Sequence, residues 1–395
     1  MNRGKYLLFL SLMCLPLAGC SDFWGRPTNL NFLNVPFAAT KPAAFVPVQP
    51  IFKNLSYPTD VCAGYDNLIY VADAGVQQIV CYDQAGNRLG SFTVPGLKTV
   101  KQDRQLDLLA IGTYDTIVSG IKYTFAAIYR IEQKNSVYGL QEAYFKNIII
   151  HPFYYKNSFS ATDPAVNFND IAILADNSYY VTRSGTSNSS NQFGGPDNNV
   201  LYFSSQDQFL TTILISTSTG TYSDYFQKPF GITTLAQPPQ STYVSTSTDF
   251  IYTSQNNNAP LKVQYITQEA TSYGVSNVVK DFTPDTFLAK SYIYKPYRFT
   301  IPAHITVDGS GTGDIFVADE GSDSIYIFLP SGIEGVNPES GSTSKKAVYA
   351  SFGGFGNSPS QFNKPMGVAY LNDILYVADA GNGCIKRFKL TYNFQ

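Results

Sequence analysis

Three segments of the chain repeat one pattern, and this repetition constrains the fold more than any other feature. The copies span residues 57–92, 301–332 and 364–390. Each copy runs from a proline through a short apolar stretch and a turn to a stretch that ends in Val-Ala-Asp, then through a glycine-bearing turn into another alternating stretch. Short alternating stretches separated by turn residues predict strands, and self-similarity at this spacing is typical of folds assembled from one repeated unit. Each copy therefore predicts a β-meander.

The second stretch of each copy has aliphatic residues on one face and an aromatic residue on the other. In the first copy Ile69 and Val71 share a face, while Tyr70 points to the opposite one. The pattern recurs in the other copies, as Ile315 and Val317 with Phe316, and as Leu375 and Val377 with Tyr376. Side chains alternate between the faces of a strand, so these strands are expected to be buried on both sides, between neighbouring sheets.

The residues after each Val-Ala pair indicate a turn. Aspartate can accept hydrogen bonds from following backbone N–H groups, and glycine tolerates a positive φ. The recurring residues are Asp73, Asp319 and Asp379, with Gly75, Gly321 and Gly381. Because the aspartate recurs in every clear copy, we interpret it as structural, and metal ligation is the weaker alternative.

These copies resemble the NHL repeat, in which a proline, a strand, Val-Ala-Asp, a turn and another strand lead to a Phe-Gly connector. The stretch from Ser351 to Ala369 is similar to that connector. The resemblance implies an all-β fold, a β-propeller of four-stranded blades. Fainter copies at residues 106–133, 166–210 and 228–266 bring the expected number to about six, with seven left open. Residues 184–197 and 267–291 are expected to be loops on a face of the propeller.

Closure of the ring requires the last blade to pair with the first part of the chain, because a propeller leaves only protected strand edges. The last copy ends near Leu390, which leaves the final blade short of a strand. Residues 45–53 precede the first copy as an unassigned strand. We expect this N-terminal strand to pair with the last blade.

The N-terminus indicates export. Arg3 and Lys5 precede an apolar run to Leu17, which is the layout of a signal peptide. The following Leu-Ala-Gly-Cys resembles the lipobox of bacterial lipoproteins, which implies lipidation of Cys20. We expect a signal peptide at 1–19, a lipid-anchored tether at 20–44 and the propeller at 45–395. Ser21 favours the outer membrane over the inner membrane of the cell envelope.

The composition excludes nucleic acid as a partner. The formal net charge is −2 and only 14% of the residues are charged, so the chain lacks the basic surface that phosphate binding needs. Beyond Cys14 and Cys20 the cysteines are Cys62, Cys81 and Cys384. Three cysteines cannot all pair within one chain, and we interpret them as small core residues, with one disulfide left open.

Alignment of the copies brings three polar residues to one equivalent place. Asp60, Asp170 and His304 each follow the start of an innermost strand, whereas Gly231 and Gly367 take that place in two other copies. Innermost strands converge on the channel, so two carboxylates and an imidazole are expected to meet there. They could hold Ca²⁺, or Zn²⁺ with a second imidazole. His304 is also the candidate catalytic residue, and polar lining of a watery channel is the alternative.

The function that we favour at this stage is a lipid-anchored binding module for an envelope protein, a glycan or a small ligand, rather than an enzyme. Tyr154 and Tyr155, in the insert that contains His151, fit an adaptable recognition loop. The alternative is a metal-assisted lyase or hydrolase with its active site in the channel, because peptidylglycine amidating lyase and virginiamycin B lyase resemble this architecture. A purely structural envelope protein is a third reading.

Overall fold

The computed structural model describes residues 43–133, 140–239, 245–271, 274–283, 287–288 and 291–394. The predicted signal peptide at 1–19, the lipidation site at Cys20 and the tether as far as residue 42 lie outside these residues. The described residues contain three short 3-10 helices, η2 (Asp163–Ala165), η3 (Ala380–Asn382) and η4 (Thr391–Asn393). No helix among them is long and apolar enough to cross a membrane.

The described strands form six sheets, which are the blades of a propeller and are antiparallel apart from one parallel pairing at the edge of blade 4. Blade 1 contains β2 (Pro58–Ala63), β3 (Ile69–Asp73), β4 (Gln78–Tyr82) and β5 (Arg88–Thr93). Blade 2 contains β6 (Thr99–Gln102), β7 (Leu108–Val118), β8 (Ile121–Glu132) and β9 (Tyr144–Ile150). Blade 3 contains β10 (Asn167–Ile173), β11 (Tyr179–Ser184), β12 (Asn199–Phe203) and β13 (Phe209–Thr212).

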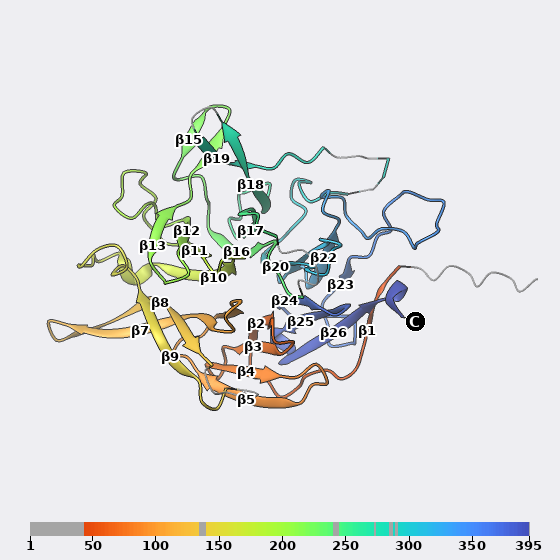
Figure 1. Ribbon diagram of the computed structural model, residues 1–395, viewed down its shortest axis with the longest axis horizontal. Coiled ribbons are helices and arrows are strands. Elements are labelled where there is room, and N and C mark those ends of the chain that lie inside the picture. Colours follow the sequence, from red (N-terminus) through yellow and green to blue (C-terminus); the bar gives the residue numbers. More distant parts are fainter. Residues whose placement is uncertain are drawn as a thin grey trace, which may run out of the picture. The chain divides into compact units, whose positions relative to one another are not determined.

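The other three blades complete the ring. Blade 4 contains β16 (Pro229–Thr234), β17 (Phe250–Ser254), β18 (Val263–Thr271) and β19 (Gly274–Val279), and it is extended by β14 (Ile215–Thr217) and β15 (Gly220–Tyr222). Blade 5 contains β20 (Pro302–Val307), β21 (Ile315–Asp319), β22 (Ser324–Phe328) and β23 (Phe352–Gly353). Blade 6 contains β24 (Pro365–Leu371), β25 (Ile374–Asp379), β26 (Cys384–Leu390) and β1 (Phe45–Pro47). Figure 1 shows the first strands of the blades, such as β2, β16 and β20, near the centre of the ring.

Strand β1 closes the ring as the sequence predicts. Phe45 pairs with Leu390 of β26, so the N-terminal strand supplies the outermost strand of the last blade. The Phe45 ring is buried edge-on against Phe316 of blade 5, with ring centroids 5.8 Å apart. The prediction of a six-bladed propeller closed by an N-terminal strand is therefore confirmed, and six is the number of blades.

The apolar cores lie between blades. In β3, Ile69 and Val71 belong to a core shared with blade 6, whereas Tyr70 and Ala72 belong to a core shared with blade 2. One strand thus contributes opposite faces to two cores, which is why its aliphatic and aromatic residues alternate. Cys62, Cys81 and Cys384 are buried and free, so the interpretation as core residues is confirmed.

The repeated aspartates tie each blade to the connector that precedes it. Asp73 accepts hydrogen bonds from the backbone N–H groups of Ser56 and Tyr57, each at 2.8 Å. Asp319 does the same with Thr300 and Ile301, at 2.6 and 2.8 Å. The donors therefore precede the first strand of the blade, whereas the sequence predicts donors that follow the aspartate. Asp319 makes such a bond as well, to the N–H of Gly321.

Two sequence predictions differ from the fold. Part of the predicted loop at 267–291 forms strands, because β18 runs to Thr271 and pairs with β19. Most residues at its outer end are solvent-facing, and polar residues there interrupt the apolar alternation that marks a strand. The second difference is β6, which the sequence left unassigned although it is the innermost strand of blade 2.

Candidate functional site

A β-bulge interrupts the innermost strand at the same point in five blades. The register shifts between Pro58 and Asp60 in blade 1, and between Pro302 and His304 in blade 5. In blades 3, 4 and 6 the shift ends at Asp170, Ile232 and Gly367, respectively. A bulge bends the strand and re-aims a side chain. The short motif around each leading residue, a proline in four of these blades and Phe168 in blade 3, thus turns the residue two positions later toward the channel.

The structure brings together the three residues that the sequence places at this point. Nε2 of His304 lies 3.2 Å from Oδ1 of Asp60 and 3.3 Å from Oδ2 of Asp170. One ligand-type atom from each residue lies within 4.8 Å of the others. All three are buried, with exposed fractions of 1%, 2% and 5% for Asp60, Asp170 and His304. Residues from blades 1, 3 and 5 therefore form one buried polar centre.

Sequence reasoning missed a fourth member of this centre, Lys101. Its ammonium nitrogen lies 2.6 Å from Oδ2 of Asp60, 3.4 Å from Oδ1 of Asp170 and 2.8 Å from Nε2 of His304. Lys101 comes from β6, two residues after Thr99, so both side chains project from the same face of the strand. The Thr99 hydroxyl donates a hydrogen bond to Asp60 and lies 3.0 Å from Asp170. The sequence signal for Thr99 and Lys101 is the alternation in Thr-Val-Lys-Gln, which places both side chains on one face of a strand.

Each of the three polar residues also accepts a backbone N–H group from the next blade. Val100 donates to Asp60 at 3.1 Å, Ile232 donates to Asp170 at 2.9 Å, and Val368 donates to Nδ1 of His304 at 3.3 Å. These bonds hold neighbouring inner strands together and fix the side chains. Gly367 permits the closest approach, because a Cβ there would lie 2.7 Å from Cα of Asp60.

The charges of the centre shape one another. Burial opposes ionisation of Asp60, but the Lys101 charge and the hydrogen bonds from Lys101 and Thr99 hold the pKa of that carboxyl below its usual value. Burial, followed by the Lys101 charge, lowers the pKa of His304, and the carboxylates oppose this shift. Asp60 and Lys101 are therefore charged at neutral pH while the imidazole is neutral.

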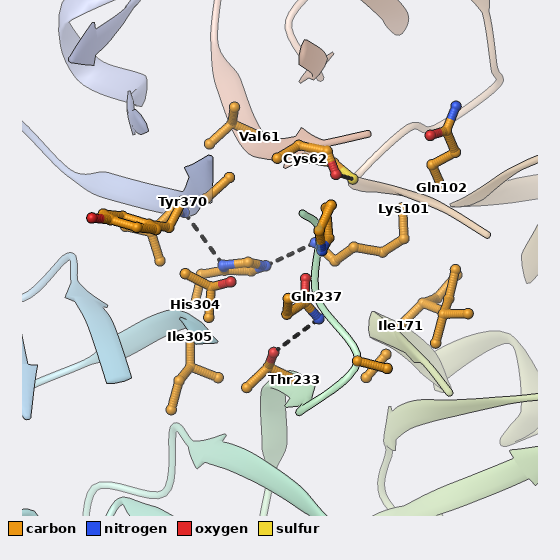
Figure 2. A pocket seen from close by; sticks show the side chains of 18 of the residues that line it. Val61, Cys62, Lys101, Gln102, Ile171, Thr233, Gln237, His304, Ile305 and Tyr370 are labelled. Carbon is orange, nitrogen blue, oxygen red and sulfur yellow. Dashed lines mark hydrogen bonds between the residues drawn. The ribbon is translucent and has the colours of Figure 1, made fainter. Parts of the chain in front are cut away.

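The centre separates two cavities at opposite ends of the inner strands. Asp60, Asp170 and His304 line one cavity of about 170 Å³, together with Phe230 and Met366. Lys101 and His304 line a smaller cavity on the other side, of about 30 Å³. Figure 2 shows this second side, where Lys101 reaches toward His304. His304 is the member of the centre that contacts both spaces.

The donor set fits a metal ion poorly in this arrangement. Two carboxylates and one imidazole are of the type that holds Ca²⁺ or Zn²⁺, but Ca²⁺ takes six to eight oxygen ligands. The Lys101 ammonium lies within hydrogen-bond distance of Asp60 and His304, where an ion would have to sit. Like charges repel strongly in a buried site, so the ammonium and a divalent ion exclude each other.

The second histidine lies elsewhere. His151 is fully buried beside Tyr154 and Phe168, with ring centroids 5.8 and 6.0 Å away, between blades 2 and 3. Tyr154 packs into this core and its hydroxyl accepts a hydrogen bond from Arg183. Tyr155 packs against Tyr154, with ring centroids 4.9 Å apart. This insert therefore packs against blade 3.

Several solved structures are similar in fold to this chain. The chain is similar to a gluconolactonase from Xanthomonas campestris, with 9% identity, coverage of 90% of this chain and 99% of that one, and a TM-score of 0.48. It is similar to virginiamycin B lyase from Staphylococcus aureus, with 12% identity, coverage of 86% and 97%, and a TM-score of 0.43. It is similar to a PQQ-bound aldose sugar dehydrogenase from Streptomyces coelicolor, with 11% identity, coverage of 89% of this chain and 100% of that one, and a TM-score of 0.47. These likenesses show the fold alone. No protein-family model and no curated protein matches the chain.

One sequence prediction is corrected here. A lipid-anchored binding module was favoured over an enzyme, and this prediction is contradicted by the similar propellers that are named as a gluconolactonase, a lyase and a dehydrogenase. A streptogramin B lyase and a luciferin-regenerating enzyme are similar as well. The alternative prediction, an enzyme with its active site in the channel, agrees better with these names.

Proposed function

We propose that the chain is an enzyme, a hydrolase or a lyase, whose active site is the buried centre formed by Asp60, Asp170, His304 and Lys101. The observation that carries this proposal is the convergence of four ionisable side chains from four blades, three of which line a cavity while Lys101 contacts them from the other side. Perturbed ionisable groups that meet in a concave site are typical of catalytic centres.

The charge balance supports proton transfer as the chemistry. Two carboxylates and one ammonium leave the centre with a net charge of −1 while the imidazole is neutral. A proton taken from a substrate or a water molecule in the cavity would bring that charge to zero. Asp60 and Asp170 line the cavity and can receive it, and His304 lies within 3.3 Å of both and can pass it on. Transfer of this kind contributes about 10²–10⁴-fold to a rate.

The cavity limits the size of the substrate group that can react in it. About 170 Å³ accommodates a small group, and the lining combines the polar centre with the apolar side chains of Phe230 and Met366. A polar groove of about 340 Å³ shares Asn169 and Phe230 with this cavity. The remainder of a larger substrate would lie in that groove.

The test is turnover of small chromogenic esters, lactones and elimination substrates by residues 43–395. We expect one of these classes to react, and we expect Asp170→Asn and His304→Gln to reduce kcat at least a hundredfold. His151→Gln is the matched control, because it changes a buried histidine away from the channel. Turnover that survives both channel substitutions in folded protein would overturn the proposal, as would no turnover of any class.

The finer sequence predictions complete this proposal. The repeat pattern supports membership of the NHL type, and the lipobox-like residues before Cys20 support an enzyme anchored to the cell envelope by lipid. Mass spectrometry of the N-terminal peptide from the full chain, expressed in a bacterium, tests the anchor. A Cys20→Ser chain should lose the acyl mass and leave the membrane fraction. An unmodified Cys20 in the wild-type protein would contradict it.

A further inference from the structure

The side-chain nitrogen of Lys101 has the surroundings that a bound cation would have. Three atoms from three other blades surround it, Oδ2 of Asp60 at 2.6 Å, Nε2 of His304 at 2.8 Å and Oδ1 of Asp170 at 3.4 Å. Asp60, Asp170 and His304 are also the described residues whose ligand-type atoms converge as a metal site would require. The ammonium thus sits among the groups that would otherwise attract a metal ion.

We propose that the ammonium of Lys101 takes the place of a divalent metal ion, so that the channel works with a cation that belongs to the chain. The metal-binding part of this inference is independent of the enzymatic function. The catalytic part rests on the proposed function, because it assigns Lys101 a role in that same site.

The charge balance makes the two cations alternatives. With Lys101 in place, the two carboxylates keep a charge of −1, and the centre needs no more than one further proton to be neutral. A divalent ion added beside the ammonium would bring the charge to +1. Burying an uncompensated charge is strongly unfavourable. With the ammonium removed, a divalent ion would neutralise Asp60 and Asp170 completely.

The carboxylate oxygens are also committed to other donors. Oδ1 of Asp170 accepts the N–H of Ile171 at 2.8 Å, and its Oδ2 accepts the N–H of Ile232 at 2.9 Å. Oδ2 of Asp60 accepts the N–H of Val100 at 3.1 Å in addition to the Lys101 contact. Few lone pairs remain for an ion that demands many oxygen ligands. The ammonium has Oδ2 of Asp60 and Oδ1 of Asp170 as acceptors. The neutral ring of His304 accepts the N–H of Val368 at Nδ1, so Nε2 carries the hydrogen and donates it to a carboxylate.

The lysine is held as a fixed part of the site. Its side chain is 14% exposed, and its stem emerges from the short strand β6 next to Thr99, which binds both aspartates. Unlike a metal ion, it cannot exchange, and it cannot generate a nucleophilic hydroxide by direct coordination. Its contribution is positive charge, which keeps the carboxylates ionised and stabilises negative charge that develops beside them.

The test is a titration of residues 43–395 with Zn²⁺ and with Ca²⁺. Calorimetry measures the binding, and the melting temperature measures its effect on stability. We expect no stoichiometric binding by the wild-type chain and no change of melting temperature with EDTA. The Lys101→Met chain should gain one site for a divalent ion, with a rise of several degrees in melting temperature on adding Zn²⁺. That gain should disappear when Asp170→Asn is added. Lys98→Met, which removes a nearby lysine of the same blade, should gain no site.

A second variant protects the test against misfolding. Lys101→Arg keeps the positive charge and should bind no metal. Metal binding by the wild-type chain tests the inference even if a variant misfolds. One equivalent of Zn²⁺ or Ca²⁺ bound by the wild-type chain, and lost in Asp60→Asn or His304→Gln, would overturn the inference. Lack of any enzymatic turnover would instead contradict the proposed function and leave this result standing, because metal binding is measured directly.

Discussion

The side-chain nitrogens of Lys101 and His304 lie 2.8 Å apart although their strands belong to blades 2 and 5, on opposite sides of the ring. The lysine therefore spans the channel axis. Its positive charge is the second cause, after burial, of the lowered pKa of His304. Burial and this contact together favour the neutral imidazole in a site that also contains two carboxylates.

Removal of Lys101 should raise the pKa of His304. The Lys101→Met substitution takes away the charge that opposes imidazolium and leaves Asp60 and Asp170, which favour it. In EDTA, the ring C2–H resonance should shift at a higher pH in the variant than in the wild type. The chain has two histidines, so a His151→Gln spectrum assigns both signals. An equal or lower pKa in the variant would show that the ammonium does not control the imidazole.

Activity should fall on acidification only below the usual histidine range. Because burial and the Lys101 charge lower the pKa of His304 below the ordinary value of a histidine, about 6.5, the neutral ring persists to lower pH than in an exposed histidine. The midpoint of the acid limb of kcat/KM against pH should therefore lie below pH 6.5. A midpoint at or above pH 6.5 would contradict a neutral His304 as the active form.

His151 should make folding sensitive to acid. It is fully buried, and burial, followed by the Arg183 charge, lowers its pKa to about 3 although Oδ1 of Asp163 lies 3.4 Å from Nε2 and opposes the shift. The unfolded chain binds a proton below about pH 6.5 and the folded chain does not, so this stability is complete above pH 6.5 and is lost as the pH falls toward 3. From pH 7 to pH 5 the loss is about 2 kcal/mol. Urea midpoints of His151→Phe should fall less over this interval than those of the wild type, and parallel losses would disprove the assignment.

Asp319 should contribute strongly to stability without touching the channel. Its carboxylate accepts three backbone N–H groups, from Thr300, Ile301 and Gly321, and it is fully buried. Asp319→Ala leaves these donors unpaired and should lower the free energy of unfolding by about 3 kcal/mol. Urea denaturation measures the change. The control is Asp115→Ala on the exposed β7–β8 hairpin, which should unfold like the wild type. Equal midpoints for both variants would refute the structural role.

The sequence predicts most of the architecture because the repeat is locally encoded. Where a proline, the Val-Ala-Asp triplet and a glycine recur, as in blades 1, 5 and 6, the strands follow directly. The same alignment predicts that Asp60, Asp170 and His304 are equivalent, since the bulge after each leading residue is part of the repeat. Equivalent positions in a closed ring point to a common axis, so their proximity follows from the topology.

The missing member of the site could not be derived in this way. Strand β6 has four residues, begins without the proline and has no bulge, so it offers no match to the other blades. A lysine on a short polar strand is usually a solvated side chain. Only the closed ring shows that Lys101 faces carboxylates from two other blades. The function was misjudged for the same reason, because three dispersed polar residues resemble channel lining until the fourth charge is seen.

Closure by β1 should be necessary for stability and for solubility. A chain that starts at residue 52 lacks β1 (Phe45–Pro47) and leaves the backbone of β26 as an open edge, which can pair with another molecule. It also loses the buried Phe45 ring, whose truncation alone costs about 3–5 kcal/mol. We expect a lower melting temperature and concentration-dependent association in sedimentation velocity, compared with a chain that starts at residue 43. Phe45→Ala in the longer chain separates the two effects, because it should lower the melting temperature and leave the protein monomeric. If the two chains melt together and remain monomeric, the N-terminal strand does not close the ring in solution.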